Sequence, residues 1–253
     1  GDEVKLNIED TTLRKHNAKL ICGKINGFGS SSDRVAYDLI LQAETGFMSM
    51  NGTSESGPVK MPVALIDVLA AHQLKEGLLL ALMKRMNDGV GRSVSVSLYE
   101  SAISSLVNQA SNYLMEHHVP QRIGSLHPNI APYGELFQTN EGDYITFAIG
   151  SDLHFQKLCA YLNVEELSTD NRFISNSERV VHRHELQQIL QEKIKPLASD
   201  QILQAMLEQH VPAGKIKDLA EVFEDPTASQ MIREEVIQET QTKRVSSIAF
   251  TWE

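Results

Sequence analysis

The sequence is poor in cysteine and contains no long apolar run, and each scarcity removes a class of protein. Only two cysteines occur among 253 residues, Cys22 and Cys159, in apolar surroundings without a CxxC pair or a metal-ligand spacing. They predict two buried thiols in a reducing compartment rather than a disulfide framework. No apolar run reaches the roughly 18 residues that a membrane-spanning helix needs, so no membrane partner is expected.

Positive charge is also scarce, because 23 Lys and Arg face 33 Asp and Glu, which gives a net charge of -10. Nucleic acids and anionic membranes need a cationic surface, so neither is an expected partner. A local basic pocket for an anionic cofactor remains compatible, because net charge averages over the whole surface. The acidic start GDEVKLNIED does not have the pattern of a signal peptide, so a cytoplasmic protein is expected.

Several common site motifs are absent as well. Among nine histidines there is no HExxH, and His182 and His184 fall on different faces of a predicted helix. No metal site is therefore predicted. The sequence contains no GxSxG elbow, no P-loop and no GxGxxG, so neither a serine hydrolase nor a nucleotide-binding fingerprint is supported.

What the first half does contain is an α/β pattern. VSVSLYES begins with strict alternation, which predicts a strand, and Ser97 is a candidate N-cap for a helix over residues 102–118. Apolar runs at 20–25 and 61–67 predict two further strands, and spacing predicts helices over 35–43 and 68–86, the first capped by Ser32 or Asp33. Strands and helices in alternation with short links predict a parallel sheet.

The pattern changes near Pro120 to an α+β arrangement. FQTNEGDYITFAIG predicts a β-hairpin. Helices are predicted to follow, and two of them begin at Ser-Asp pairs that favour capping, Ser151-Asp152 and Ser199-Asp200. A helix pair split at EDP and a strand-like end complete the chain.

One carboxylate stands out at the start of a long apolar run, VALIDVLAAHQLKEGLLLAL, which spans residues 63–82. Asp67 follows a predicted strand and precedes a predicted helix, so the local pattern favours a structural N-cap. The same position also suits a nucleophile, because strand ends and helix starts form the ligand crevice of α/β sheets and the helix macrodipole favours an ionised carboxylate. Gly27 and Gly29 are read as turn residues, or as positions where a ligand approaches the backbone.

Five blocks in order resemble one family across nearly the whole chain. They are HNAKLICGKINGFG, AYDLILQAETGFMSMNG, PVALIDVLAAHQLKEGLLLAL with the strand after it, HPNIAPYGELFQTNEGDYITFAIG and VPAGKIKDLAEVFEDP. They are similar to the family III coenzyme A transferases (CaiB/BaiF family), the group of formyl-CoA transferase and carnitine CoA-transferase.

The resemblance implies an α/β fold with a Rossmann-like parallel sheet in a large domain and a second, smaller α+β domain. The large domain would comprise residues 1–120, in part, and regain residues 213–253, with the small domain at 121–212. Family members form interlocked dimers, so an interlaced homodimer is expected.

The resemblance also implies the chemistry. An aspartate at the position of Asp67 would carry coenzyme A as an aspartyl-CoA thioester between an acyl-CoA and a small carboxylic acid. Coenzyme A is then a substrate, and no tightly bound cofactor is expected.

Further positions follow from the resemblance. Lys5 corresponds to a cation near the CoA phosphates, Arg34 and Tyr37 flank the CoA channel, and Leu98 lies near the pantetheine. Gly124 and His127 belong to a loop near the active site or have structural roles.

Two alternatives stay open. The related racemases move the α-proton of a 2-methylacyl-CoA with a histidine at the position of Tyr37, and a tyrosine is a poor base at neutral pH. The second alternative is a truncated, non-catalytic homologue that serves as a binding subunit. It is suggested because the family's opening segment and extreme C-terminus have no counterpart in this sequence.

Overall fold

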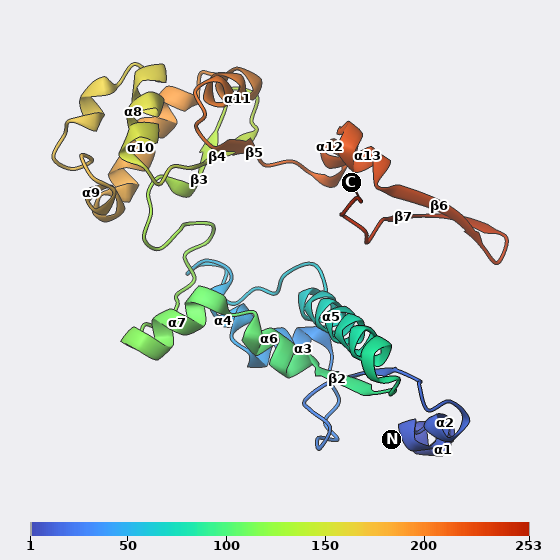
Figure 1. Cartoon of the computed structure of the whole chain (residues 1–253). Coiled ribbons are helices and arrows are strands. Elements are labelled where there is room, and N and C mark those ends of the chain that lie inside the picture. Colours follow the sequence, from blue (N-terminus) through green and yellow to red (C-terminus); the bar gives the residue numbers. More distant parts are fainter. Residues whose placement is uncertain (1, 253) are drawn as a thin grey trace. The chain divides into compact units, whose positions relative to one another are not determined.

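The computed structural model describes residues 2–252, and the chain divides into two compact units, residues 1–124 and 125–253 (Figure 1). The elements of the first unit are α1 (Asp2–Lys5), α2 (Asp10–His16), β1 (Cys22–Asn26), α3 (Asp38–Glu44), α4 (Phe47–Met50), α5 (Leu65–Asp88), β2 (Ser93–Ser97), α6 (Leu98–Ser104) and α7 (Val107–Glu116). Those of the second unit are β3 (Tyr133–Gln138), β4 (Tyr144–Ala148), α8 (Asp152–Tyr161), the 3-10 helix η1 (Glu165–Ser168), α9 (Asn176–Val181), α10 (Arg183–Ile194), α11 (Ser199–Glu208), β5 (Ala213–Lys215), α12 (Leu219–Glu224), α13 (Pro226–Gln230), β6 (Ile232–Ile237) and β7 (Thr240–Val245).

The first unit is built on a parallel strand pair. β1 and β2 run in parallel, with Cys22 opposite Ser93 and Asn26 opposite Ser97. Parallel strands need a long crossover, and here the crossover carries α3, α4 and α5. Helix α5 packs on both strands and on α6 (Figure 1). The predicted α/β class with a parallel sheet and helices is therefore confirmed.

Small residues let α5 approach the strands closely. A Cβ atom at Gly77 would lie 2.5 Å from Cγ1 of Val94 on β2. On β1, a Cβ at Gly23 would lie 3.2 Å from Leu78 of the same helix. The C-terminal half of α5 thus lies against the beginnings of both strands, and its first turn points toward their carboxyl ends.

The strand predicted over residues 61–67 is wrong. Pro58 and Pro62 lack backbone N–H groups, and the N–H of Met61 donates to the side chain of Gln42 at 2.8 Å. The segment therefore satisfies its backbone without a neighbouring strand. Helix α5 begins earlier than predicted, at Leu65.

The predicted helix over residues 102–118 is two helices, α6 and α7. The hydroxyls of Ser104 and Ser105 both donate to the carbonyl of Ser101, at 3.0 and 2.8 Å. Such side-chain bonds compete with the helical ladder, and α6 ends there. The predicted cap at Ser97 is confirmed, because its hydroxyl accepts the N–H of Glu100 at 3.3 Å.

The second unit contains an antiparallel sheet in the order β3-β4-β5. The hairpin predicted from FQTNEGDYITFAIG is confirmed as β3 and β4. One face of the sheet packs against the helices in a cluster that includes Phe137, Phe147, Phe155 and Leu190, all buried. The pair β6-β7 follows α12 and α13, and the return of residues 213–253 to the large domain stays a prediction.

The two Ser-Asp caps have different outcomes. Ser151 accepts the N–H of His154 at 3.2 Å and caps α8 as predicted. Ser199 lies inside α11 instead, and its hydroxyl oxygen lies 3.1 Å from a carboxylate oxygen of Glu141 and 3.1 Å from one of Asp143, which share its single proton. The tertiary contact with the hairpin turn therefore replaces the local cap.

A buried arginine joins the parts of the second unit. Arg179 on α9 is fully buried, and its guanidinium donates to the carbonyls of Ala131 at 2.9 Å and Phe173 at 3.1 Å. It also pairs with Asp152 at 2.8 Å and lies over the ring of Phe155, 4.6 Å from the centroid. One side chain thus holds the loop before β3, the start of α8 and the segment before α9.

Replacing Arg179 should destabilise the second unit. We expect Arg179→Met to lower its free energy of unfolding by about 2–4 kcal/mol, because two buried carbonyls would lose their donor. Arg172→Met is the matched control, since that arginine is partly exposed and pairs with Asp170 and Glu185 at the surface, a contact worth at most about 1 kcal/mol. Urea unfolding measures both, and equal losses would contradict the structural role of Arg179.

Candidate active site

Segments from four parts of the first unit meet where the two parallel strands end. A buried cluster of Leu41, Ile66 and Ala102 lies there. The partly buried residues packed around it are Phe28, Ala36, Phe47, Leu69 and Leu98. The N–H of Tyr99 donates to the carbonyl of Gly27 at 2.9 Å and ties the two strand ends together. This edge is where open α/β sheets place their ligands.

The glycine-rich turn after β1 is shaped by its own side chains. Oδ1 of Asn26 accepts the N–H of Gly29 at 2.7 Å, and Gly29 has a φ of 93°. At Gly27 a Cβ atom would lie only 2.3 Å from Cβ of Ala36. The close approach that Gly27 permits is therefore made by the chain itself, and it holds the segment before α3 against the strand end.

Asp67 is the third residue of α5 and is exposed. The prediction that it caps the helix is wrong, because α5 begins before it and the N-cap position belongs to Ala64, which offers no capping side chain. Asp38 supplies the cap from another helix, since its Oδ1 accepts the N–H of Ile66 at 2.7 Å. Within residues 2–252 no hydrogen bond or ion pair engages the Asp67 carboxylate.

The surroundings of Asp67 favour its neutral form more than water does. Partial burial raises the pKa of the Asp67 carboxyl, and the negative charge of Asp38 raises it further. The helix macrodipole acts in the opposite direction. The expectation that the start of the helix holds this group ionised stays a prediction. Asp67 takes up its proton at a higher pH than an ordinary aspartate.

Three other predicted residues lie on the segments that meet here. Arg34 lies 3.8 Å from the ring centroid of Phe28 and pairs with Glu44. Tyr37 directly precedes Asp38 and is 70% exposed. Leu98 begins α6 and packs on the buried cluster.

Lys5 is placed differently. It ends α1 and is exposed, and α1 contributes no residue to the cluster. The helix is tied to β1 by the ion pair of Glu3 with Lys24 at 3.0 Å. The structural roles of Asp38 and Gln42 are not predicted from the sequence. Their separation of four residues, which puts two polar side chains on one face of an apolar helix, was the available signal.

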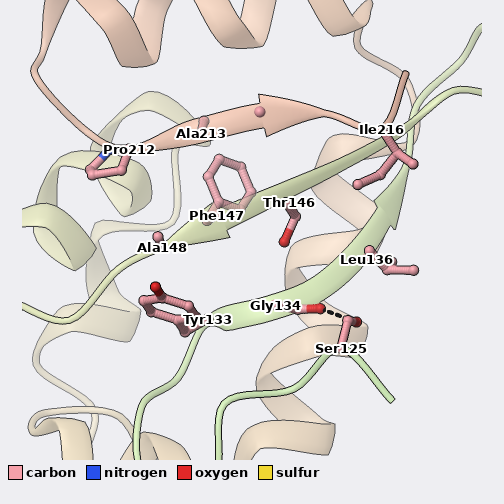
Figure 2. A pocket seen from close by; sticks show the side chains of 11 residues that line it. Ser125, Tyr133, Gly134, Leu136, Thr146, Phe147, Ala148, Pro212, Ala213 and Ile216 are labelled. Atoms are coloured by element: carbon pink, nitrogen blue, oxygen red, sulfur yellow. Dashed lines mark hydrogen bonds between the residues drawn. The ribbon is translucent and has the colours of Figure 1, made fainter. Parts of the chain in front are cut away.

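A separate hollow of about 380 Å³ lies over the sheet of the second unit (Figure 2). Its lining is mostly apolar and includes Tyr133, Leu136 and Thr146. The ring of His127 lies 5.0 Å from that of Tyr133, a residue of this lining. The predicted proximity of Gly124 and His127 to an active site stays a prediction.

Other chemistries find little support in the part of the chain that the structure describes. No group of three or more His, Cys, Asp or Glu side chains is placed to hold a metal ion there. Burial raises the pKa of the Cys159 thiol to about 12, and burial together with Asp10 raises that of Cys22. Neither cysteine has the lowered pKa of a reactive thiol. No helix among residues 2–252 has both the length and the apolar character to cross a membrane.

Known proteins match the chain along its whole length. The sequence profile of CoA-transferase family III matches residues 1–252. A succinate–glutarate CoA-transferase of Agrobacterium fabrum is 34% identical over 88% of this chain and 56% of its own length. A succinyl-CoA–D-citramalate CoA-transferase of Chloroflexus aurantiacus is 29% identical over 85% of this chain and 54% of its own length. The chain therefore spans about half the length of the curated relatives it matches.

A solved structure agrees with these matches. A CAIB/BAIF family protein from Brucella suis superimposes on this chain with a TM-score of 0.82 and is 33% identical in sequence. The match covers 99% of this chain and 66% of that protein. The profile match and the structural match agree with the sequence resemblance. The chain therefore belongs to CoA-transferase family III.

Proposed function

We propose that the protein transfers coenzyme A from an acyl-CoA to a small carboxylic acid, with Asp67 as the nucleophile. The observation that carries this proposal is the Asp67 carboxylate on the first turn of α5, which has no hydrogen-bond or ion-pair partner among residues 2–252 and lies at the carboxyl edge of the parallel strands. Its raised pKa means a more basic carboxylate, which favours attack once the group is ionised. Coenzyme A enters as a substrate and leaves on the product.

In the proposed reaction Asp67 is bonded first to the acyl group of the donor and then to coenzyme A. A carboxylate oxygen attacks the thioester carbonyl, the C–S bond breaks, and an acyl-aspartyl anhydride and the CoA thiolate form. The thiolate then attacks the Asp67 carbonyl carbon and releases the donor acid, which leaves an aspartyl-CoA thioester. The acceptor carboxylate attacks that thioester, and the thiolate finally takes the acceptor acyl group and frees Asp67. A carboxylate is a weak nucleophile, so positioning must supply much of the rate.

The substrates to test first are suggested by the relatives. Two of them are named for transfer among succinate, glutarate and D-citramalate, so dicarboxylic acids and their CoA thioesters are the proposed donors and acceptors. These names favour transfer over racemisation. Arg34, Tyr37 and Leu98 are proposed to contact coenzyme A, as is Lys5 at its phosphates.

We also propose an interlaced homodimer. Large apolar side chains on the C-terminal half of α5 are exposed, among them Leu80, Met83 and Met86, and such a surface favours burial in an assembly. Light scattering of the complete protein should give twice the mass of one subunit. Dissociation should accompany unfolding in urea, because interlaced chains cannot part while folded. A monomer mass would contradict the dimer.

Asp67→Asn should abolish transfer, with a loss of at least about 10³-fold in kcat, because the amide is not a nucleophile. With succinyl-CoA the wild type should yield a hydroxamate at Asp67 after hydroxylamine, detected by peptide mass spectrometry. Asp88→Asn at the far end of α5 is the control and should retain activity. If the wild-type protein binds acyl-CoA but forms no adduct, the result would contradict the transferase proposal and favour the hypothesis of a non-catalytic binding subunit.

The activity should fall in acid at a higher pH than an ordinary aspartate dictates. Since Asp38 and burial raise the pKa of Asp67, the attacking form is lost as pH falls through that raised value. Asp38→Asn removes the neighbouring charge and keeps an oxygen to accept the Ile66 N–H, but its NH2 group faces Nε2 of Gln42, so the maximal rate should also fall. The position of the acid limb of kcat/KM, rather than its height, is therefore the readout, and it should move to lower pH. Asp33→Asn, the same charge change on an exposed turn, should leave the limb in place. A shift to higher pH in Asp38→Asn would contradict this assignment.

A further inference from the structure

Gln42 is a fully buried amide between two segments of the candidate site. It lies on α3 with no exposed surface. Its Nε2 donates to Oδ2 of Asp38 at 2.6 Å, and its Oε1 accepts the N–H of Met61 at 2.8 Å. Both ends of the amide are therefore bound, as a buried polar group requires.

The partner of this amide is itself shared between two helices. One oxygen of Asp38 accepts from Gln42, and the other accepts the N–H of Ile66 in the first turn of α5. The terminal torsion of an aspartate is broad and roughly two-fold, so a carboxylate held on one side only can rotate. The second bond from Gln42 fixes the plane in which Asp38 meets α5.

The other end of Gln42 acts on the same helix through the chain that leads into it. Its bond to Met61 holds the segment five residues before Ile66, and its Nε2 also lies 3.5 Å from the carbonyl of Val63. One amide thus fixes both the approach to α5 and the carboxylate that caps it. Asp67 follows Ile66 directly.

We propose that Gln42 is a positioning residue for Asp67, which it places through Asp38 and the first turn of α5. The role rests on the proposed function, and it adds a residue that cannot touch substrate because its side chain is enclosed. Removal of the amide should misplace the nucleophile while the surfaces that bind acyl-CoA stay intact. A misplacement on the scale of 1 Å can lower a rate by about 100-fold.

The test is a double-mutant cycle in the complete protein. Gln42→Met should lower the rate of hydroxylamine-trapped acylation by succinyl-CoA by about 100-fold, with KM for succinyl-CoA changed by less than about threefold. In an Asp38→Ala background the same substitution should lower the rate by much less than about 100-fold, because the route through Asp38 is gone and only the contacts with Met61 and Val63 remain. Equal losses in both backgrounds would overturn the proposal.

Thr45→Val is the matched control. Thr45 is also buried on the C-terminal side of α3, and its hydroxyl donates to the carbonyl of Leu41 without touching Asp38. It should lower stability with little effect on acylation. If Gln42→Met behaves in the same way, Gln42 has a structural role only.

A second measurement separates this proposal from the proposed function. Amide hydrogen exchange reports the Ile66 N–H directly, and its protection should fall in Gln42→Met but not in Thr45→Val. Unchanged protection would overturn the positioning role. Absence of any Asp67 adduct in the wild type, with protection lost in Gln42→Met, would refute the transferase chemistry and leave the placement of α5 by Gln42 supported.

Discussion

The carboxylate of Asp38 is the contact on which the candidate site depends. The first turn of an α-helix has N–H groups without helical partners, and α5 begins after Ala64, a residue that cannot cap it. Asp38, which lies on the neighbouring helix α3, accepts a hydrogen bond from one of these groups, the N–H of Ile66. The cap is thereby supplied from outside, and Asp67, the third residue of the helix, is left without a capping bond. The two carboxylates have divided roles: one is bound from two sides, and the other is exposed with a raised pKa.

The two units differ in how their apolar residues are used. In the second unit a large cluster is buried between a three-stranded sheet and its helices, with Arg179 bound at its margin. In the first unit the fully buried cluster contains only Leu41, Ile66 and Ala102, while many side chains of α5 are exposed. Parallel sheets are normally covered on both faces, and residues 2–252 contribute two strands to this sheet. A site on a sheet with so small a buried cluster gains rigidity from specific hydrogen bonds. Asp38 and Gln42 provide such bonds.

Local signals predicted the elements that depend on local physics. Alternation identified β2, the turn residues between aromatic runs identified the β3-β4 hairpin, and Ser97 and Ser151 were correct caps. Two of the failures have tertiary causes. Residues 61–67 read as a strand because they are apolar, yet their backbone is bound by a side chain from α3. The cap expected at Ser32 or Asp33 is absent, because α3 begins only at Asp38 after a segment that packs against Gly27.

Asp67 shows most clearly what each level decides. The α/β class, the family resemblance and the presence of an acid near the start of a long helix could be predicted from the sequence alone, because periodicity and motifs are local properties of the chain. The tertiary structure supplies the competing cap from Asp38, 29 residues earlier, and for this reason Asp67 does not cap its helix. It also decided the direction of the pKa of Asp67, because burial and a neighbouring charge depend on which segments meet in space.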